Sequence, residues 1–292
     1  MPELAYLNGV FGPIEQAKVS IEDRGFQFGD GVYEVMVVYN GRPFLFAEHL
    51  QRLGRSADAI GLEYDFDAHP IEPIIREGLR RSELHDAMVY LQITRGAAPR
   101  SHVAPEGITP TVVMTFKPLP TLPDELRRQG AKLLTTPDIR WARCSVKAIT
   151  LLPNVLAKTE AFRRGCDDAL FISADGEVRE CTSSNIFMAI DGACIHPPRT
   201  EAVLHGVTQA FLVRCARAIG IRMTEQKIDL ESLRRADEVF LSGTAMDVLG
   251  VTLIDDQPVG TGRVGPLTQR LYREFIAQSR GGGASEGGSR SP

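Results

Sequence analysis

A proline-rich segment near the middle of the chain most limits what this sequence can fold into. It reads KPLPTLP, from Lys117 to Pro123, and has three prolines in seven residues. Proline removes a backbone N–H donor and stiffens the chain, which is typical of a boundary between domains. The 292 residues also exceed what one ordinary hydrophobic core contains. We therefore predict two domains, residues 1–117 and 124–279, joined by a linker at 118–123.

Strands and helices are both predicted on each side of this linker. Residues 32–39 (VYEVMVVY) are β-branched and aromatic, and the Asn40-Gly41 pair that follows favours a tight turn and a second extended stretch at 43–46. Apolar residues at helical spacing predict helices at 48–60, 74–84, 155–164, 208–219 and 267–278. Further strands are predicted at 89–94, 111–116, 132–136, 169–173, 185–190, 239–241 and 251–254.

The order of these elements predicts the fold class. Strands and helices alternate without the regular strand–helix–strand rhythm of a doubly wound sheet, so we expect an α+β protein. The connection at 95–110 is long and rich in Gly, Pro and Ala, and long loops in compact domains are often functional. The final segment 280–292 (RGGGASEGGSRSP) lacks the apolar residues that a core needs, which predicts a disordered tail.

Composition excludes several classes of function. A net charge of −4 gives no electrostatic reason to expect nucleic acid or an acidic membrane surface as a partner. The N-terminal residues lack a basic region followed by an apolar run, and no apolar stretch approaches the roughly 20 residues of a membrane-spanning helix. Five scattered cysteines without a C-x-x-C pair indicate reduced thiols in the cytoplasm, and the six histidines show no spacing typical of metal ligands.

One lysine stands in a setting that could make it reactive. Lys147 lies in an apolar stretch, 138–152 (DIRWARCSVKAITLL), that we expect to be extended. A lysine amine becomes nucleophilic near neutral pH only if burial or nearby cations lower its pKa, and Arg140 and Arg143 are close in sequence. From spacing alone, a lysine at a strand end that reaches solvent is the more common situation.

Three further segments could surround such an amine. Residues 204–208 (LHGVT) lead directly into a predicted helix, whose first turn offers unpaired N–H groups to an anion, and 241–245 (LSGTA) forms a second small turn. Glu180, before a Thr/Ser/Asn run, could hold a ring nitrogen protonated. Arg52 could reach a phosphate, whereas His49, one helical turn away, is interpreted as a surface or capping residue. Each of these segments alone is more often structural.

Several separated motifs occur together in one family's order and spacing. They are DRGFQFGDGVY at 23–33, TRGAAPRSH at 94–102, the Lys147 region, Glu180 with its polar run, and the helix start at Gly206-Val207-Thr208. From about residue 4 to residue 278 the chain resembles the fold-type IV aminotransferases, which depend on pyridoxal phosphate, and within them the D-amino-acid aminotransferases. The resemblance implies two α/β domains with the cofactor between them.

The resemblance also implies a role for each matching residue. Lys147 would hold the cofactor as a Schiff base and move the substrate proton, and Glu180 would pair with the pyridinium nitrogen. The remaining cofactor contacts would be the ring-packing Leu204 and the phosphate-binding residues Arg52, Val207, Thr208 and Thr244.

Substrate residues follow from the same resemblance. Tyr33, Arg100 and His102 would bind the substrate carboxylate, with Arg100 and His102 coming from the neighbouring subunit of a homodimer. Arginine can bind a carboxylate through two parallel N–H bonds, which would fix the orientation of the substrate. By the resemblance, the Arg100-x-His102 pair indicates D-amino acids as substrates, with 2-oxo acids as acceptors. The substrate side chain would lie near Val35, Val37, Ser183 and Gly243, small or apolar residues that predict tolerance of apolar D-amino acids beside D-alanine and D-glutamate.

Other functions remain open at this point. The same fold includes branched-chain aminotransferases for L-amino acids, aminodeoxychorismate lyases that release pyruvate, and amine transaminases. A protein that binds pyridoxal phosphate without turnover would keep Lys147 but would not need Arg100 and His102. A dinucleotide enzyme, suggested by Gly29-x-Gly31, is disfavoured because the full glycine spacing is absent and a strand follows where a helix is required.

Overall fold

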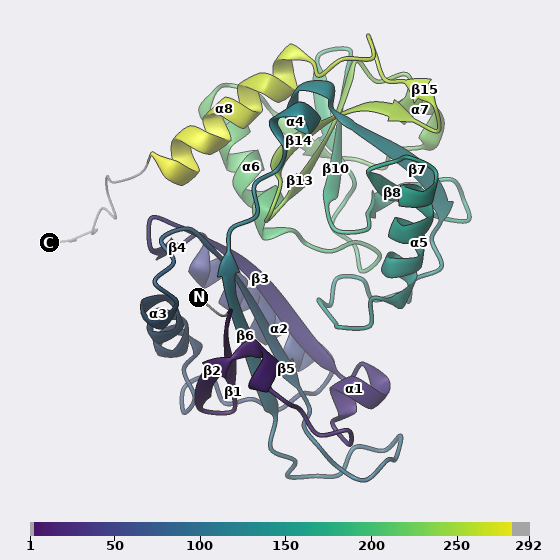
Figure 1. The fold of residues 1–292 in the computed structure, drawn as a ribbon. Coiled ribbons are helices and arrows are strands. Elements are labelled where there is room, and N and C mark those ends of the chain that lie inside the picture. Colours follow the sequence, from purple (N-terminus) through teal and green to yellow (C-terminus); the bar gives the residue numbers. More distant parts are fainter. Residues whose placement is uncertain (1–2, 282–292) are drawn as a thin grey trace, which may run out of the picture.

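Two β-sheets, one before and one after the proline-rich segment, dominate the structure, a computed structural model that describes residues 3–281 (Figure 1). The first sheet has six strands in the order β2-β1-β6-β5-β3-β4, and every neighbouring pair is antiparallel. Its strands are β1 (Leu4–Leu7), β2 (Val10–Pro13), β3 (Gly31–Tyr39), β4 (Arg42–Pro43), β5 (Ala87–Thr94) and β6 (Thr111–Pro118).

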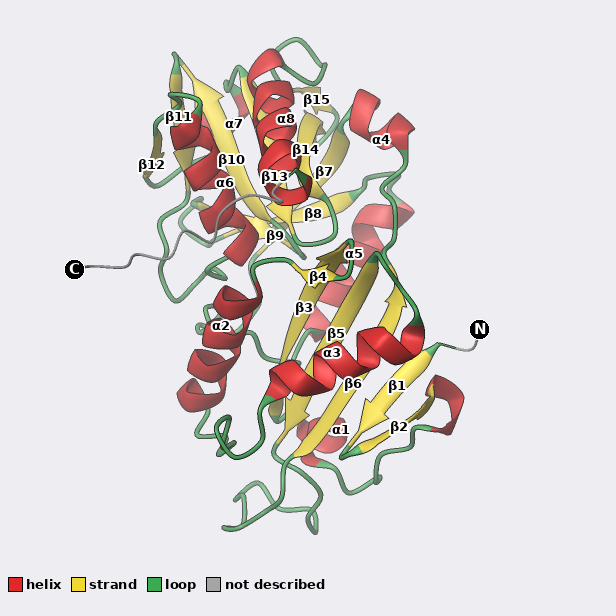
Figure 2. Cartoon of the chain, turned by 90° about the vertical axis from the view of Figure 1, so that its left-hand side faces the viewer, coloured by secondary structure: helices red, strands yellow, loops and turns green. Residues whose placement is uncertain are grey.

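Helices cover one face of this first sheet and make its core. Two amphipathic helices, α2 (Phe46–Ala59) and α3 (Ile71–Ser82), bury Leu53, Ile71 and Ile75 against Val89, Leu91 and their neighbours. In Figure 2, α3 crosses in front of the sheet and α2 stands to its left. The helical elements of this half are η1 (Ile14–Gln16), α1 (Arg24–Phe28), α2 (Phe46–Ala59) and α3 (Ile71–Ser82).

The second sheet is mixed and has nine strands. Eight of them follow the order β12-β11-β10-β13-β14-β7-β8-β9, and β15 pairs with β14. Three neighbouring pairs are parallel: β7 with β8, β7 with β14, and β11 with β12. The strands are β7 (Ala131–Pro137), β8 (Asp168–Ile172), β9 (Val178–Cys181), β10 (Asn185–Ile190), β11 (Ala193–His196), β12 (Met223–Glu225), β13 (Glu238–Gly243), β14 (Asp247–Ile254) and β15 (Gln257–Pro258).

Helices α6 and α8 lie side by side on one face of this sheet, where Phe211 and Phe275 meet edge to face (Figure 2). The other face has its own core around Leu170, Ile186 and Leu249. The helices of this half are α4 (Asp124–Gln129), α5 (Leu152–Arg163), α6 (Val207–Ala218), α7 (Leu230–Arg234) and α8 (Pro266–Arg280). No helix within residues 3–281 is long and apolar enough to cross a membrane.

The α+β expectation is confirmed, and each predicted helix and strand of the pattern analysis overlaps an observed one. Two local predictions at the ends of elements are wrong. Residues 43–46 do not continue extended, because Leu45 adopts a left-handed φ of 53° and α2 begins at Phe46. Arg280, placed in the tail, is the last residue of α8 and pairs with Asp247. The rest of that tail, 282–292, lies outside the described residues.

Candidate active site

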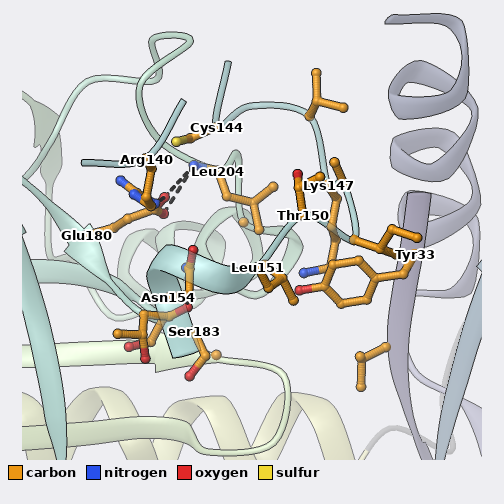
Figure 3. Close-up of a pocket in the computed structure, with 18 of the residues that line it drawn as sticks. Tyr33, Arg140, Cys144, Lys147, Thr150, Leu151, Asn154, Glu180, Ser183 and Leu204 are labelled. Atoms are coloured by element: carbon orange, nitrogen blue, oxygen red, sulfur yellow. Dashed lines mark hydrogen bonds and ion pairs between the residues drawn. The ribbon is translucent and has the colours of Figure 1, made fainter. Parts of the chain in front are cut away.

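A cavity of about 820 Å³ opens between the two halves of the chain, and its walls come from both sheets (Figure 3). The first sheet contributes β3, and the second half contributes the connection from β7 to α5, the end of β9, the start of α6 and the turn after β13. Of the residues predicted for the site, eleven line it: Tyr33, Val35, Arg52, Lys147, Glu180, Ser183, Leu204, Val207, Thr208, Gly243 and Thr244.

Lys147 is fixed in this cavity by its own backbone. Its carbonyl accepts from the N–H of Tyr33 at 3.0 Å, and its N–H donates to Ser56 Oγ at 3.1 Å. The flanking Val146 and Ala148 are buried in the core of the first sheet. The segment is therefore not a continuous extended stretch, as we expected, but a loop whose one isolated β-bridge, Val32 with Ala148, joins it to β3.

The Lys147 amine has the low pKa that a nucleophilic amine needs. Burial, with a smaller effect of the Arg52 cation, lowers its pKa from 10.5 to about 8. Its Nζ lies 4.2 Å from the ring centroid of Tyr33, so the amine faces the cavity rather than solvent (Figure 3). The sequence-based explanation was wrong in one respect: Arg140 is paired with Asp138 and Glu180, and Arg143 lies near Glu201, so neither provides the main effect.

Glu180 is buried among donors at the other side of the cavity (Figure 3). Its carboxylate accepts from the Leu204 N–H at 3.0 and 3.1 Å, from Arg140 Nη1 at 2.7 Å and from Asn185 Nδ2 at 3.2 Å. Burial raises the pKa of this carboxyl, while Arg140 opposes the rise. A carboxylate held rigidly in this way can pair with a protonated ring nitrogen.

A phosphate would find matching donors where α6 begins. Gly206 precedes the helix without a side-chain cap, which leaves the first-turn N–H groups open to an anion. Thr208 Oγ1 and Thr244 Oγ1 face each other at 3.5 Å, and the buried hydroxyl of Ser242, also in the wall, has no hydrogen-bond partner among the described residues. A Cβ at position 206 would lie 2.0 Å from Asn185 Oδ1, so only glycine fits. The donor set therefore suits pyridoxal phosphate.

Arg52 has partners that the sequence did not reveal. Its guanidinium binds the fully buried Glu34 through Nε at 2.7 Å and Nη2 at 2.8 Å, and Nη1 reaches the His205 carbonyl at 3.2 Å. His49 is wrongly interpreted as a surface or capping residue: it is buried, with Nδ1 2.7 Å from Glu34. Burial would raise the Glu34 pKa, but bonds from Arg52 and His49 lower it to about 2.

Not all predicted substrate residues line the cavity. Val37 is 1% exposed and does not line the cavity. It lies further along β3, where the Phe44 N–H donates a hydrogen bond to its carbonyl. Val35 keeps the position we expected. The wall also includes four residues that the sequence analysis missed, since no charge or spacing signal marks them: Thr150, Leu151, Asn154 and Met246.

Arg100 and His102 lie outside the lining of their own chain's cavity. Both are exposed and pack on Phe28, at 4.6 Å and 5.7 Å from its ring centroid respectively. Arg24 fixes their loop by donating to the carbonyl of Ser101 at 2.6 Å and of His102 at 3.3 Å. Their side chains are thus ordered at the surface on Phe28, which itself lines the cavity.

Comparisons with known proteins agree with this geometry. Residues 31–254 match the family model described as amino-transferase class IV. The chain is 38% identical over 270 residues to the D-alanine aminotransferase of Staphylococcus epidermidis, covering 92% of this chain and 95% of that protein. It is 38% identical over 264 residues to the D-alanine aminotransferase of Bacillus licheniformis, covering 90% and 93%. A structure of the branched-chain amino acid aminotransferase from Escherichia coli superimposes with a TM-score of 0.88 at 27% identity, covering 99% and 98%.

Proposed function

The chain belongs to the class IV aminotransferases, and from this membership we propose that it moves amino groups between D-amino acids and 2-oxo acids, with Lys147 as its catalytic residue. The enzyme depends on pyridoxal phosphate. The observation that carries the proposal is the Lys147 amine, with its pKa near 8, in one cavity with Glu180 and the open start of α6.

Pyridoxal phosphate, when bound, supplies an electron sink for negative charge at the substrate Cα. Glu180 would pair with its ring nitrogen and keep that nitrogen protonated, and the protonated ring would be a stronger electron sink. The phosphate would be bound by the N–H groups of Val207 and Thr208 and by the hydroxyls of Thr208 and Thr244. Leu204 would pack on the ring face, and Arg52 would contribute positive charge while Glu34 fixes its orientation.

Lys147 would move the substrate proton. An amine with a pKa near 8 has a far larger neutral fraction at physiological pH than an ordinary lysine, so Nζ can accept a proton and return it at a neighbouring carbon. Tyr33 stays protonated, because burial raises its pKa to about 12, and its hydroxyl can donate to a substrate carboxylate. Because the amino donor and the 2-oxo acid would react one after the other at the same site, we expect ping-pong kinetics.

The second subunit of a homodimer would supply Arg100 and His102, and an apolar surface around the cavity supports this assembly. Phe26 (72% exposed) and Leu152 (67%) lie on its rim, and Val103 (78%) lies in the loop that carries the pair. Along α5, exposed apolar residues recur at helical spacing: Leu152, Val155, Leu156 and Phe162. Both α5 and α1 lie on the same side of the molecule in Figures 1 and 2. An apolar face of this kind marks an association surface.

Two coarser features complete the proposal. We infer that residues 1–117 and 124–279 are separate domains joined at 118–123, supported by the distinct core of each sheet. We also infer a cytoplasmic location, supported by five cysteines that are all free.

The test is a half-reaction on the purified holoenzyme without a 2-oxo acid. The visible absorption of the bound cofactor is recorded, and D-alanine, D-leucine or L-leucine is added to separate samples. We expect both D-amino acids to convert the cofactor to its pyridoxamine form and L-leucine to leave it unchanged. Conversion by L-leucine alone would instead assign the branched-chain activity, and release of pyruvate from aminodeoxychorismate would assign the lyase. Conversion by D-alanine without D-leucine would refute tolerance of apolar side chains.

A further inference from the structure

A single turn separates the main cavity from a second one. Residues 243–246 connect β13 to β14, and within this turn Thr244 and Ala245 line both cavities. The second cavity, of about 290 Å³, lies behind the turn and reaches the proline-rich segment at Leu119–Leu122. The turn that presents the Thr244 hydroxyl to the main cavity is therefore not backed by a close-packed core. Besides the pairing of β13 with β14, side-chain interactions hold it in place.

The support comes from Asp247, the residue that ends the turn. Asp247 is buried and has a left-handed φ of 60°, a conformation that Asp and Asn tolerate better than most residues. Its carboxylate binds donors from three separate elements: Tyr39 Oη of β3 at 3.1 Å, Arg127 Nη2 of α4 at 3.2 Å and Arg280 Nη2 of α8 at 2.9 Å. One buried side chain thus joins the first sheet to two helices of the second half.

Two arginines make this junction stiff. Arg127 Nη1 also donates to the carbonyls of Met246 and Val248, at 3.3 and 3.2 Å, and so clamps the backbone on both sides of Asp247. Its guanidinium packs on Tyr272 at 4.4 Å, while that of Arg280 packs on Tyr39 at 4.9 Å. Because these donors are on different elements, losing the charge at Asp247 weakens the attachment of the turn to both halves at once.

We propose that Asp247 is a positioning residue that holds the 243–246 turn against the start of α6 and thereby fixes the spacing between the Thr244 and Thr208 hydroxyls. This inference rests on the proposed function, in which those hydroxyls bind the phosphate of the cofactor. It gives the C-terminal end of α8 a role in cofactor retention through Arg280. Asp247 itself does not line the main cavity.

The experiment compares two ligands that differ only in the phosphate. Apoenzyme carrying Asp247→Asn keeps the shape and the left-handed conformation but loses the charge. Binding of pyridoxal phosphate and of unphosphorylated pyridoxal is measured by absorbance titration. We expect the Kd for pyridoxal phosphate to rise about tenfold or more, as for loss of a charged hydrogen bond, with the Kd for pyridoxal unchanged. Arg280→Ala should shift the first Kd in the same direction, and Arg273→Ala, an exposed arginine of the same helix, should shift neither.

Equal weakening of both ligands by Asp247→Asn would overturn the proposal, because it would show a general structural role, and so would an unchanged Kd for pyridoxal phosphate. If Asp247→Asn does not fold, Tyr39→Phe removes one donor and keeps the packed ring, and it should weaken only the phosphorylated ligand; an unchanged Kd there would also overturn the proposal. A wild-type protein that binds both ligands equally would instead refute the phosphate site in the proposed function. The two failures are thus distinguishable.

Discussion

At the scale of single residues, Lys147 shows what sequence spacing can and cannot reveal. Its position was recognisable from the motif, but the groups that tune its pKa come from β3 and α2, far away in sequence. Arg140 and Arg143, the neighbours in sequence, bind carboxylates elsewhere. The burial of Glu34 and His49 was missed for the same reason: a polar residue in a strand or helix carries no mark of its partner until the fold brings the two together.

The pKa of Lys147 leads to a prediction for the apoenzyme. Because burial and Arg52 favour the neutral amine, reductive methylation of Lys147 should show a midpoint near pH 8, whereas a free lysine side chain has a pKa of about 10.4. Peptide mass spectrometry after brief labelling across pH 6–11 measures the profile, with N-acetyl-lysine as the reference. Coincident profiles for Lys147 and the reference would contradict the low pKa.

Glu34 should matter more for stability than any exposed carboxylate. Glu34→Gln leaves the Arg52 cation buried without its anion, and breaking a buried pair costs about 3–5 kcal/mol. Chemical denaturation of the apoenzyme at neutral pH measures this loss. The matched control is Glu72→Gln, which removes an exposed pair with Arg76 and should change the free energy of unfolding by less than about 1 kcal/mol. Similar losses for the two variants would refute a special role for Glu34.

The same carboxyl predicts an acid limit. Its folded pKa of about 2 lies below the ordinary 4.5, so the folded state binds fewer protons between these values. The stabilisation is fully present above about pH 4.5 and is lost as the pH falls toward 2. Unfolding free energies measured from pH 6 downward should fall less steeply in Glu34→Gln than in the wild type. Parallel curves would indicate that Glu34 does not have this depressed pKa.

At the scale of elements, long periodic segments were predictable and short ones were not. The strand at Gly31–Tyr39 and the helix at Phe46–Ala59 carry enough apolar residues to define a period. Strands of two to four residues, such as β4, β11 and β12, are set by pairing with neighbours rather than by their own pattern. The loop that carries Lys147 looked extended because its apolar residues pack on the other half's core, a tertiary effect that local pattern cannot distinguish from a strand.

Two helical glycines provide an opposite pair of predictions. In α2, a Cβ at Gly54 would meet nothing within 4 Å, so Gly54→Ala should stabilise the protein by about 0.5–1 kcal/mol. In α3, a Cβ at Gly78 would lie 2.0 Å from the buried ring of Phe116, so Gly78→Ala should destabilise it by about 1–3 kcal/mol. The denaturant midpoints of the two apo variants, compared with that of the wild-type apoenzyme, measure these changes. A stabilising effect of Gly78→Ala would show that α3 does not pack this closely on β6.

At the scale of the whole molecule, the charges that line the cavity bear on the proposed homodimer. Its described lining holds three cationic side chains, Arg52, Arg140 and Lys147, and the two arginines bind Glu34 and Glu180. A substrate carboxylate therefore lacks a free arginine there, while Arg100 is displayed on the surface beside the same rim. If, as proposed, a second copy covers the exposed apolar residues of α5 and places its Arg100 at the cavity mouth, the same interface would bury the apolar surface and supply the guanidinium.

Mixing two inactive variants tests this arrangement. Lys147→Ala removes the amine, and Arg100→Ala removes the carboxylate ligand, so each homodimer should transaminate D-alanine poorly. If Arg100 acts across the interface, a hybrid dimer contains one site with Lys147 from the Arg100→Ala chain and Arg100 from the Lys147→Ala chain. Co-refolding equal amounts gives about half hybrids, each with one of its two sites intact, so about a quarter of wild-type activity should return. If Arg100 served its own chain, no hybrid would hold a complete site and mixing would restore nothing, because every site would lack either the amine or the guanidinium.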